Sequence, residues 1–263
     1  MNIMGIVLAT LIVGGTGLIL GFFLCFSAEK FKVEVDPREV AIIEVLPGNN
    51  CGGCGYAGCS GLAAAIVKGE APCNGCPVGG STVGAIVADI MDMAVEEGDK
   101  KVAFVKCSGK CDKTTLNYEY TGYTDCNAMM FVPGKGPKAC DYGCMGFGSC
   151  VKVCQFDAIH IVDGIAQVDP GACKACGKCV SACPNHLIEL VPQKAKHIVM
   201  CSSNEKGKSV MNVCQSGCIG CGICVKQCEF DAVHLENNIA YIDQDKCTGC
   251  GKCAEKCPRK VIL

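Results

Sequence analysis

The chain contains no tryptophan, and aromatic residues make up only 6% of its 263 residues. Large rings therefore fill little of the interior, and another bulky group has to occupy that volume. A basic excess is also missing, since 24 Lys and Arg stand against 26 Asp and Glu, which excludes the footprint of a nucleic-acid-binding protein. No G-x-G-x-x-G fingerprint stands between a strand and a helix, so no dinucleotide-binding unit is predicted.

Cysteine is the residue in excess, with 27 copies. Disulfide frameworks belong mostly to short secreted chains, whereas these cysteines stand in tight C-x-x-C runs that suit an inorganic core. Four thiolates are what a [4Fe–4S] cluster requires. Tetrahedral zinc uses the same donors and is the chemical alternative. The composition therefore predicts metal ligation rather than disulfide bonding.

The N-terminus carries an apolar run, residues 3–26, without a charged side chain. Such a run is long enough to cross a bilayer, so we expect residues 1–28 to form a transmembrane anchor. A cleaved signal peptide is the alternative, but it would have a charged start and a shorter apolar core. Lys30, Lys32 and Arg38 follow the run, and the positive-inside rule then predicts a single-pass protein of the cytoplasmic membrane with its bulk on the cytoplasmic side.

A first cysteine module is predicted over residues 34–97. Its spacing is C-x2-C-x4-C, followed after a helix-length gap by Cys73 and Cys76, either of which could supply the fourth thiolate. Cys76 is preferred because a Cys-Pro pair often closes such motifs. The dense glycines favour iron–sulfur over zinc, since they let the backbone aim N–H groups at sulfur. The predicted ligands of cluster 1 are Cys51, Cys54, Cys59 and Cys76.

A repeat occupies the C-terminal half, where residues 149–184 match residues 223–258 with residue numbers that differ by 74. A fixed offset marks duplicated modules, here 140–192 and 216–263. Within each, an alternating segment predicts a β-hairpin, at 156–169 and 230–243. Three runs have the spacing C-x2-C-x2-C-x3-C of two-cluster bacterial ferredoxins. They begin at Cys173, Cys218 and Cys247.

In that ferredoxin pattern, three cysteines of a run hold one cluster and the fourth crosses to the cluster of the paired run. Cluster 3 is then predicted at Cys173, Cys176, Cys179 and Cys154; cluster 4 at Cys218, Cys221, Cys224 and Cys257; and cluster 5 at Cys247, Cys250, Cys253 and Cys228. The fourth run is expanded, and by analogy cluster 2 is predicted at Cys140, Cys144, Cys150 and Cys183. These four clusters and cluster 1 make five.

Cysteines outside these motifs lie in two further segments, 98–139 and the linker 193–215. They suggest a sixth cluster at Cys107, Cys111, Cys126 and Cys201, with Cys214 as the alternative fourth ligand. The linker would then have to fold back against residues 107–126. The alternative is a set of free thiols. The predicted fold class is α+β: a transmembrane helix, a small helical four-cysteine module and two tandem ferredoxin modules.

This order of segments resembles the B subunits of Rnf complexes (the RnfB family), the ion-translocating ferredoxin:NAD+ oxidoreductases. The resemblance covers essentially the whole chain and is carried most specifically by CGGCGYAGC and CPVGGSTVGAIVADIM. It implies a membrane-bound electron carrier that accepts electrons from soluble ferredoxin and passes them to the other subunits, which couple this flow to Na+ or H+ transport and NAD+ reduction. An electron-accepting subunit of another membrane enzyme, such as a hydrogenase or reductase, is the alternative.

Overall fold

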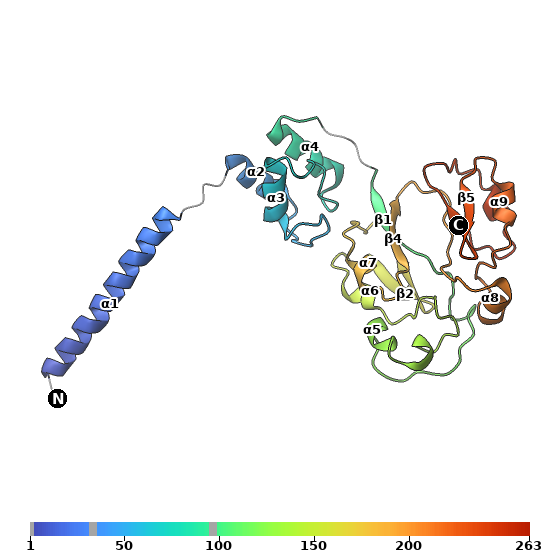
Figure 1. Ribbon diagram of the computed structural model, residues 1–263, viewed down its shortest axis with the longest axis horizontal. Coiled ribbons are helices and arrows are strands. Elements are labelled where there is room, and N and C mark those ends of the chain that lie inside the picture. Colours follow the sequence, from blue (N-terminus) through green and yellow to red (C-terminus); the bar gives the residue numbers. More distant parts are fainter. Residues whose placement is uncertain (1–2, 32–35, 95–98) are drawn as a thin grey trace.

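The computed structural model describes residues 3–31, 36–94 and 99–263. Three parts follow one another along the chain: a long helix, a small helical module and a larger cysteine-rich body (Figure 1). The N-terminal helices are α1 (Ile3–Lys30), α2 (Pro37–Val45), α3 (Cys59–Val67) and α4 (Gly80–Met91). The strands are β1 (Lys101–Val105), β2 (Ile159–Val162), β3 (Ile165–Val168), β4 (Ile188–Pro192), β5 (Val233–Glu236) and β6 (Ile239–Ile242). The short helices of the body are α5 (Cys126–Met129), η1 (Pro133–Lys135), α6 (Ser149–Lys152), α7 (Lys178–Ala182), α8 (Gly207–Val213), α9 (Ile223–Gln227) and α10 (Lys252–Glu255).

The predicted fold class included a transmembrane helix, and this part of the prediction is wrong. Among the described residues, none of the helices combines the length and the apolar character that a membrane crossing needs. A single crossing takes about 20 consecutive apolar residues. Lys32, part of the expected basic flank, lies outside the described residues.

The helical module packs α2, α3 and α4 around Ile42, Leu62 and Val87, which are almost completely buried. Asp36 begins α2 because its carboxylate accepts the Arg38 N–H and Pro37 follows at the first helical position. Helix α4 ends at Met91, because Asp92 adopts a left-handed conformation.

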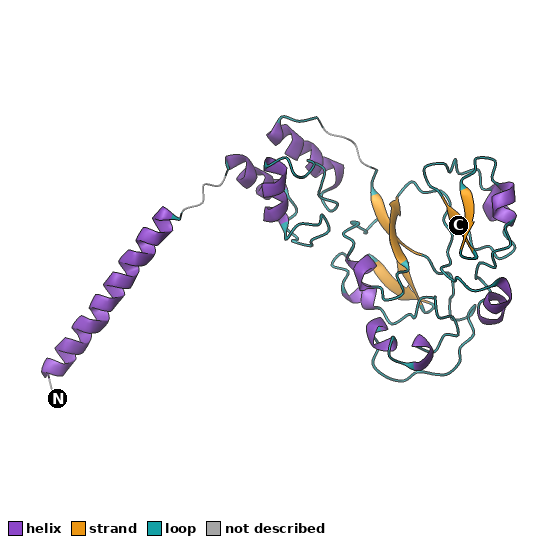
Figure 2. Cartoon of the chain, in the orientation of Figure 1, coloured by secondary structure: helices purple, strands orange, loops and turns teal. Residues whose placement is uncertain are grey.

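The cysteine-rich body contains three two-stranded antiparallel sheets, β1–β4, β2–β3 and β5–β6. Both predicted hairpins are confirmed: β2 pairs with β3 and β5 with β6 in the same register, so that Ile159 faces Val168 as Val233 faces Ile242. Loops join these short strands and helices over most of the body (Figure 2). Regular secondary structure therefore makes up only a small part of the body, and loops make up the rest.

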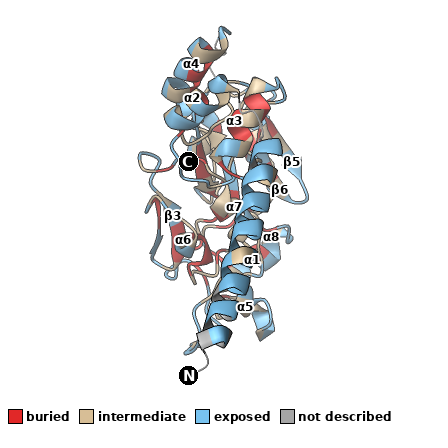
Figure 3. Cartoon of the chain, turned by 90° about the vertical axis from the view of Figure 1, so that its left-hand side faces the viewer, coloured by how far each residue is buried: buried red, intermediate tan, exposed pale blue. Residues whose placement is uncertain are grey.

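Each ferredoxin module gains one further pairing from a segment that precedes it. Strand β1 pairs with β4, from Lys101 opposite Pro192 to Val105 opposite Ile188. In the second module the segment 198–200 runs beside 261–263, through hydrogen bonds from Met200 N to Val261 O and from Leu263 N to Ile198 O. Each module has its own buried core, and the buried residues gather inside the modules, whereas α1 is mostly exposed (Figure 3).

Candidate iron–sulfur centres

The second ferredoxin module gathers its cysteines into two sets, each around a cavity. One cavity, of about 350 Å³, has four of them in its wall: Cys218, Cys221, Cys224 and Cys257; we call this set site 2B. The other, of about 300 Å³, has Cys228, Cys247, Cys250 and Cys253; we call it site 2A. In both sets the last cysteine of one run joins three cysteines of the other. These are the sets predicted for clusters 4 and 5.

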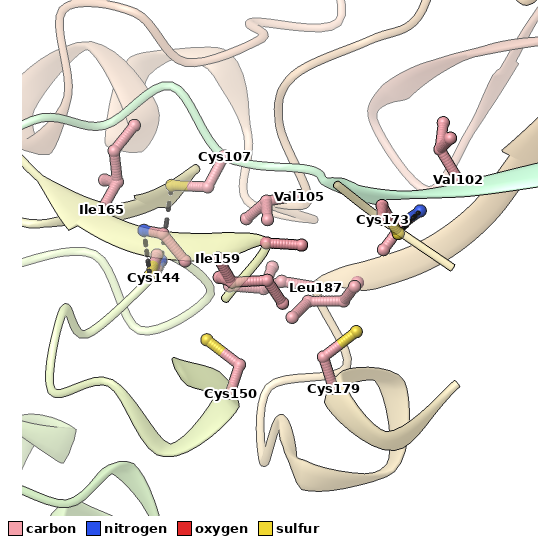
Figure 4. Packing of buried hydrophobic residues seen from close by; sticks show 14 residues of the cluster. Val102, Val105, Cys107, Cys144, Cys150, Ile159, Ile165, Cys173, Cys179 and Leu187 are labelled. Atoms are coloured by element: carbon pink, nitrogen blue, oxygen red, sulfur yellow. Dashed lines mark hydrogen bonds between the residues drawn. The ribbon is translucent and has the colours of Figure 1, made fainter. Parts of the chain in front are cut away.

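The first module repeats site 2A as site 1A. Cys154, Cys173, Cys176 and Cys179 line a cavity of about 320 Å³, and they are the set predicted for cluster 3. Figure 4 shows the sulfurs of Cys150 and Cys179 directed from their helices toward the buried strands. Burial, and after it the neighbouring thiols of Cys176 and Cys173, raise the pKa of the Cys179 thiol to about 11, as expected for sulfurs that lie close together.

The remaining site of the first module, site 1B, differs from the set predicted for cluster 2. A cavity of about 390 Å³ is lined by Cys126, Cys144, Cys150 and Cys183, and not by Cys140. Burial raises the pKa of Cys150 to about 12, and the thiols of Cys144, Cys126 and Cys183 add to the increase. At the position equivalent to Cys221 in the repeat this module has Phe147. Cys126 therefore supplies the sulfur that the expanded run lacks.

A hydrogen-bond network holds Cys126 against α6. The buried Ser149 hydroxyl accepts the Cys126 N–H at 2.8 Å and donates to Asp125 at 3.1 Å. The same carboxylate caps α5 through the Asn127 N–H, and Lys152 donates to Thr124 O at 2.8 Å. Because Ser149 directly precedes Cys150 on α6, this network fixes the two cysteines next to each other.

A further cavity, of about 400 Å³, lies between the two ferredoxin modules. Its wall includes Cys107, Cys140, Cys201 and Cys214; we call this set the middle site. A Cβ at Gly143 would lie 3.4 Å from Cys140 Sγ and 3.7 Å from Cys107 Sγ. One at Gly109 would lie 3.5 Å from Cys107 Sγ and 3.6 Å from Cys214 Sγ. The sulfurs of Cys107, Cys140 and Cys214 therefore lie around these two glycines, within contact distance of at least one of the two Cβ positions.

The middle site is nearly symmetric between the modules. Cys140 and Cys214 are equivalent in the repeat, since their numbers differ by the same 74, and Cys107 and Cys201 each follow the strand segment that precedes their module. Reciprocal hydrogen bonds join the flanking segments: Ser108 Oγ donates to Met200 O at 3.1 Å, and Ser202 Oγ donates to Lys106 O at 3.1 Å. Each module thus contributes one equivalent pair of cysteines.

The linker folds back onto residues 107–116, as the sixth cluster had required. Thr115 N donates to Val213 O at 2.9 Å and Gln215 N to Lys113 O at 2.7 Å, and these bonds bring Cys214 beside Thr114. Two of the residues suggested for that cluster do not reach this cavity: Cys126 lies in site 1B, and Cys111 is exposed with its N–H bonded to Asp163 O.

The N-terminal module supplies one more set, the N-terminal site, at Cys51, Cys54, Cys59 and Cys76. Burial raises the pKa of Cys76, two backbone N–H groups lower it, and the thiols of Cys59 and Cys54 raise it. Cys73 instead contacts Met93, with 4.0 Å between the two sulfurs. The geometry therefore favours Cys76 over Cys73 as the fourth cysteine of this site.

Backbone N–H groups point at many of these sulfurs, as iron-bound thiolates require. In the repeat, three bonds of 3.4 Å recur with the same spacing, from Ala158 N to Cys154, from Leu187 N to Cys183 and from Ala232 N to Cys228. At the middle site Cys144 N donates to Cys107 at 3.3 Å, as the dashed line in Figure 4 shows, and Ser203 N donates to Cys201 at 3.5 Å.

The donor chemistry fits [4Fe–4S] clusters: four sulfurs per set, N–H groups aimed at them and a cavity of several hundred Å³ among the sulfurs. Within residues 3–31, 36–94 and 99–263, no group of three or more His, Cys, Asp or Glu side chains is arranged to hold a single metal ion. Sequence reasoning missed Cys126 as the partner of Cys150. It also missed the pairing of Cys140 with Cys214, although the offset of 74 carried that signal.

Comparison with protein families identifies three iron–sulfur segments. Residues 46–78 match the family described as "Putative Fe-S cluster", and residues 172–232 and 217–262 match two families of 4Fe-4S dicluster domains. The chain therefore carries [4Fe–4S] clusters. The match over 172–232 includes the linker between the two modules. The cavities of sites 1A, 2A and 2B, in contrast, are each lined by cysteines of a single module, 140–192 or 216–263. Site 1B follows the same pattern apart from Cys126.

Three curated relatives are similar to the chain over most of its length. It is 48% identical to the B subunit of the Na+-translocating ferredoxin:NAD+ oxidoreductase complex of Acetobacterium woodii, over 89% of this chain and 70% of the relative. It is 40% identical to the B subunit of an ion-translocating oxidoreductase complex of Methanosarcina acetivorans, over 95% of both chains. It is 42% identical to the B subunit of the proton-translocating ferredoxin:NAD+ oxidoreductase complex of Clostridium ljungdahlii, over 87% of this chain and 81% of the relative.

Proposed function

The chain belongs to the family of B subunits of ion-translocating oxidoreductase complexes, and on this premise we propose that it passes electrons from reduced ferredoxin through six [4Fe–4S] clusters to the other subunits. Its partners are those subunits, and its activity is that of an electron-transfer subunit of a ferredoxin:NAD+ oxidoreductase. The observation that carries this proposal is that cysteines line five cavities, with four in each of the cavities of sites 1A, 1B, 2A and 2B and five, including Cys144 of site 1B, in that of the middle site.

Each cluster is assigned to one set of cysteines. The N-terminal site and sites 1A, 2A and 2B keep the ligands that spacing predicts. Site 1B takes Cys126 in place of Cys140, and the middle site takes Cys107, Cys140, Cys201 and Cys214. Cys25, Cys73 and Cys111 are left as thiols. The first ferredoxin module then comprises 140–192 together with β1 and residues 106–139, and the second comprises 216–263 together with the linker 193–215.

Contacts between the sites support a linear electron path. The loop of the N-terminal site touches site 1A, because a Cβ at Gly53 would lie 2.6 Å from Cys176 O. Cys144 of site 1B donates its N–H to Cys107 of the middle site. On the other side, Cys201 of the middle site lies near Cys218 of site 2B. The proposed order is therefore site 2A, site 2B, middle site, site 1B, site 1A and N-terminal site.

The setting of this path follows from the chemistry of the relatives. Ion translocation takes place across a membrane, so the chain works at a membrane, in a complex that couples electron flow to Na+ or H+ transport. Its reduced thiols and oxygen-sensitive clusters favour the cytoplasmic side. NAD+ and flavin are expected on other subunits, because the chain has no dinucleotide fingerprint in a strand-to-helix setting.

The test is reduction by ferredoxin. Anaerobically purified protein should be brown and zinc-free, and reduced ferredoxin should bleach its visible absorption by electron transfer. A colourless protein that contains zinc would overturn the cluster assignment in favour of structural four-cysteine zinc sites. A brown protein that reduced ferredoxin does not bleach would instead indicate a different electron donor, as expected for a subunit of a hydrogenase or another reductase.

A further inference from the structure

Lys138 is a cation enclosed inside the cysteine-rich body. Only 7% of its surface is exposed. Its backbone is held by an antiparallel bridge to Leu116, and its ammonium group donates to three backbone carbonyls, those of Gly109 at 2.9 Å, Cys144 at 2.9 Å and Gly164 at 2.6 Å. Three acceptors satisfy all three N–H bonds of an ammonium group, and they hold the Lys138 ammonium in place.

The ammonium group lies between two of the proposed clusters. Lys138 lines the cavity of the middle site, and one of its acceptors belongs to Cys144, a residue of site 1B. Gly109 O, another acceptor, follows Cys107 of the middle site by two residues. The same positive charge therefore lies next to residues of both sites.

No carboxylate neutralises this charge in the described part of the chain. The hydrogen-bond partners of Lys138 are carbonyl dipoles, and none of the ion pairs among described residues includes it. Lys106 also lines the cavity of the middle site, but it pairs with Glu189. Arg259 lines the cavity of site 2B and donates to the carbonyls of Cys214 and Gly217. It is only half-buried, so water screens it more than Lys138. The repeat has neutral Asn212 at the position equivalent to Lys138.

We propose that Lys138 tunes redox potential: its enclosed charge raises the reduction potentials of the clusters at the middle site and site 1B. This rests on the proposed function. Reduction adds one negative charge to a cluster that is already anionic, and a nearby fixed positive charge in a low dielectric stabilises the reduced form. An electron that leaves the second module is then stabilised on the clusters of the middle site and site 1B before it passes to site 1A.

The step involves only electron transfer. A reduced cluster of the second module loses one electron and becomes oxidised, and the cluster of the middle site gains that electron. No bond forms or breaks in this step. Lys138 therefore acts through its charge alone, and it does not contact the electron donor, ferredoxin.

The test is an anaerobic redox titration, followed by electron paramagnetic resonance, of the Lys138→Met variant. Two of the couples should shift to lower potential, with a tenfold smaller ratio of reduced to oxidised form at a fixed potential, which is about 59 mV for a one-electron couple. Lys110→Met is the matched control: Lys110 is exposed and paired with Asp163, and its loss should shift no couple. Unchanged potentials in the Lys138→Met variant with full iron content would overturn the proposal.

A second variant separates the effect of the lost charge from an effect of lost iron. Lys138→Gln removes the charge but keeps a hydrogen-bond donor for the carbonyls, and it should show the same two shifts. Loss of iron from both neutral variants, with iron retained in Lys138→Arg, would assign Lys138 a purely structural role and overturn the proposal. A failure of the proposed function would give a different result from a failure of this proposal, because the wild-type protein would then contain no iron at the middle site and site 1B.

Discussion

In the proposed site 1B, Cys126 completes a set of cysteines that its motif leaves short. The expanded run of the first module has Phe147 where the second module has Cys221. A sulfur from a short helix outside the run fills the position, held there by Ser149 and Asp125. Spacing predicted the sets of sites 1A, 2A and 2B because their cysteines lie in regular runs. It could not predict Cys126, since the loop between α5 and α6 has no periodic pattern.

Replacement of Cys126 should therefore affect site 1B. In the Cys126→Ser variant we expect the loss of about four iron atoms, the content of one cluster, or conversion of that cluster to a form with altered electron paramagnetic resonance. Iron analysis and spectra of the anaerobic protein measure both.

Cys111→Ser is the matched control for this prediction. Cys111 comes from the same unassigned segment, but it is exposed and lines neither the middle site nor site 1B. It should keep its full iron content. If Cys111→Ser lost iron while Cys126→Ser kept it, the original set for the sixth cluster would hold and our assignment would be wrong.

At the scale of elements, local pattern predicted the hairpins and missed the pairings that are distant in sequence. The alternating segments at 156–169 and 230–243 form β2–β3 and β5–β6. The pairing of β1 with β4 joins Lys101 to Pro192, and no local signal in either strand names such a distant partner.

One contact between elements joins the N-terminal module to the first ferredoxin module. A Cβ at Gly53 would lie 2.6 Å from Cys176 O and 2.9 Å from Cys176 Cα, closer than van der Waals contact allows. The Gly53→Ala substitution should push the two modules apart and slow electron exchange between the N-terminal site and site 1A, with iron content unchanged. Rapid-freeze electron paramagnetic resonance after reduction by ferredoxin measures this rate.

Gly61→Ala serves as the comparison, since its Cβ would lie 3.7 Å from Tyr56 Cβ, an ordinary contact. It changes the same module without the clash and should leave the exchange rate as it is. An equal rate in the wild-type and Gly53→Ala proteins would show that this contact does not carry the electron path.

At the scale of the whole molecule, the two ferredoxin modules meet at the middle site, to which each module contributes two cysteines. The repeat in the sequence predicted two modules, and the family matches support [4Fe–4S] clusters in them. The sequence pattern alone did not show that the modules share a site, because Cys107 and Cys201 precede their modules by different lengths of chain. The expected membrane anchor was wrong for the described residues.

A series of six clusters, one of them shared by both modules, is best tested by locating the iron. Anomalous diffraction at the iron edge, from anaerobic crystals of the full chain, should show six cluster positions and about 24 iron atoms. One of these positions should lie among Cys107, Cys140, Cys201 and Cys214. Five positions, with no iron between the modules, would rule out the shared cluster and break the proposed electron path.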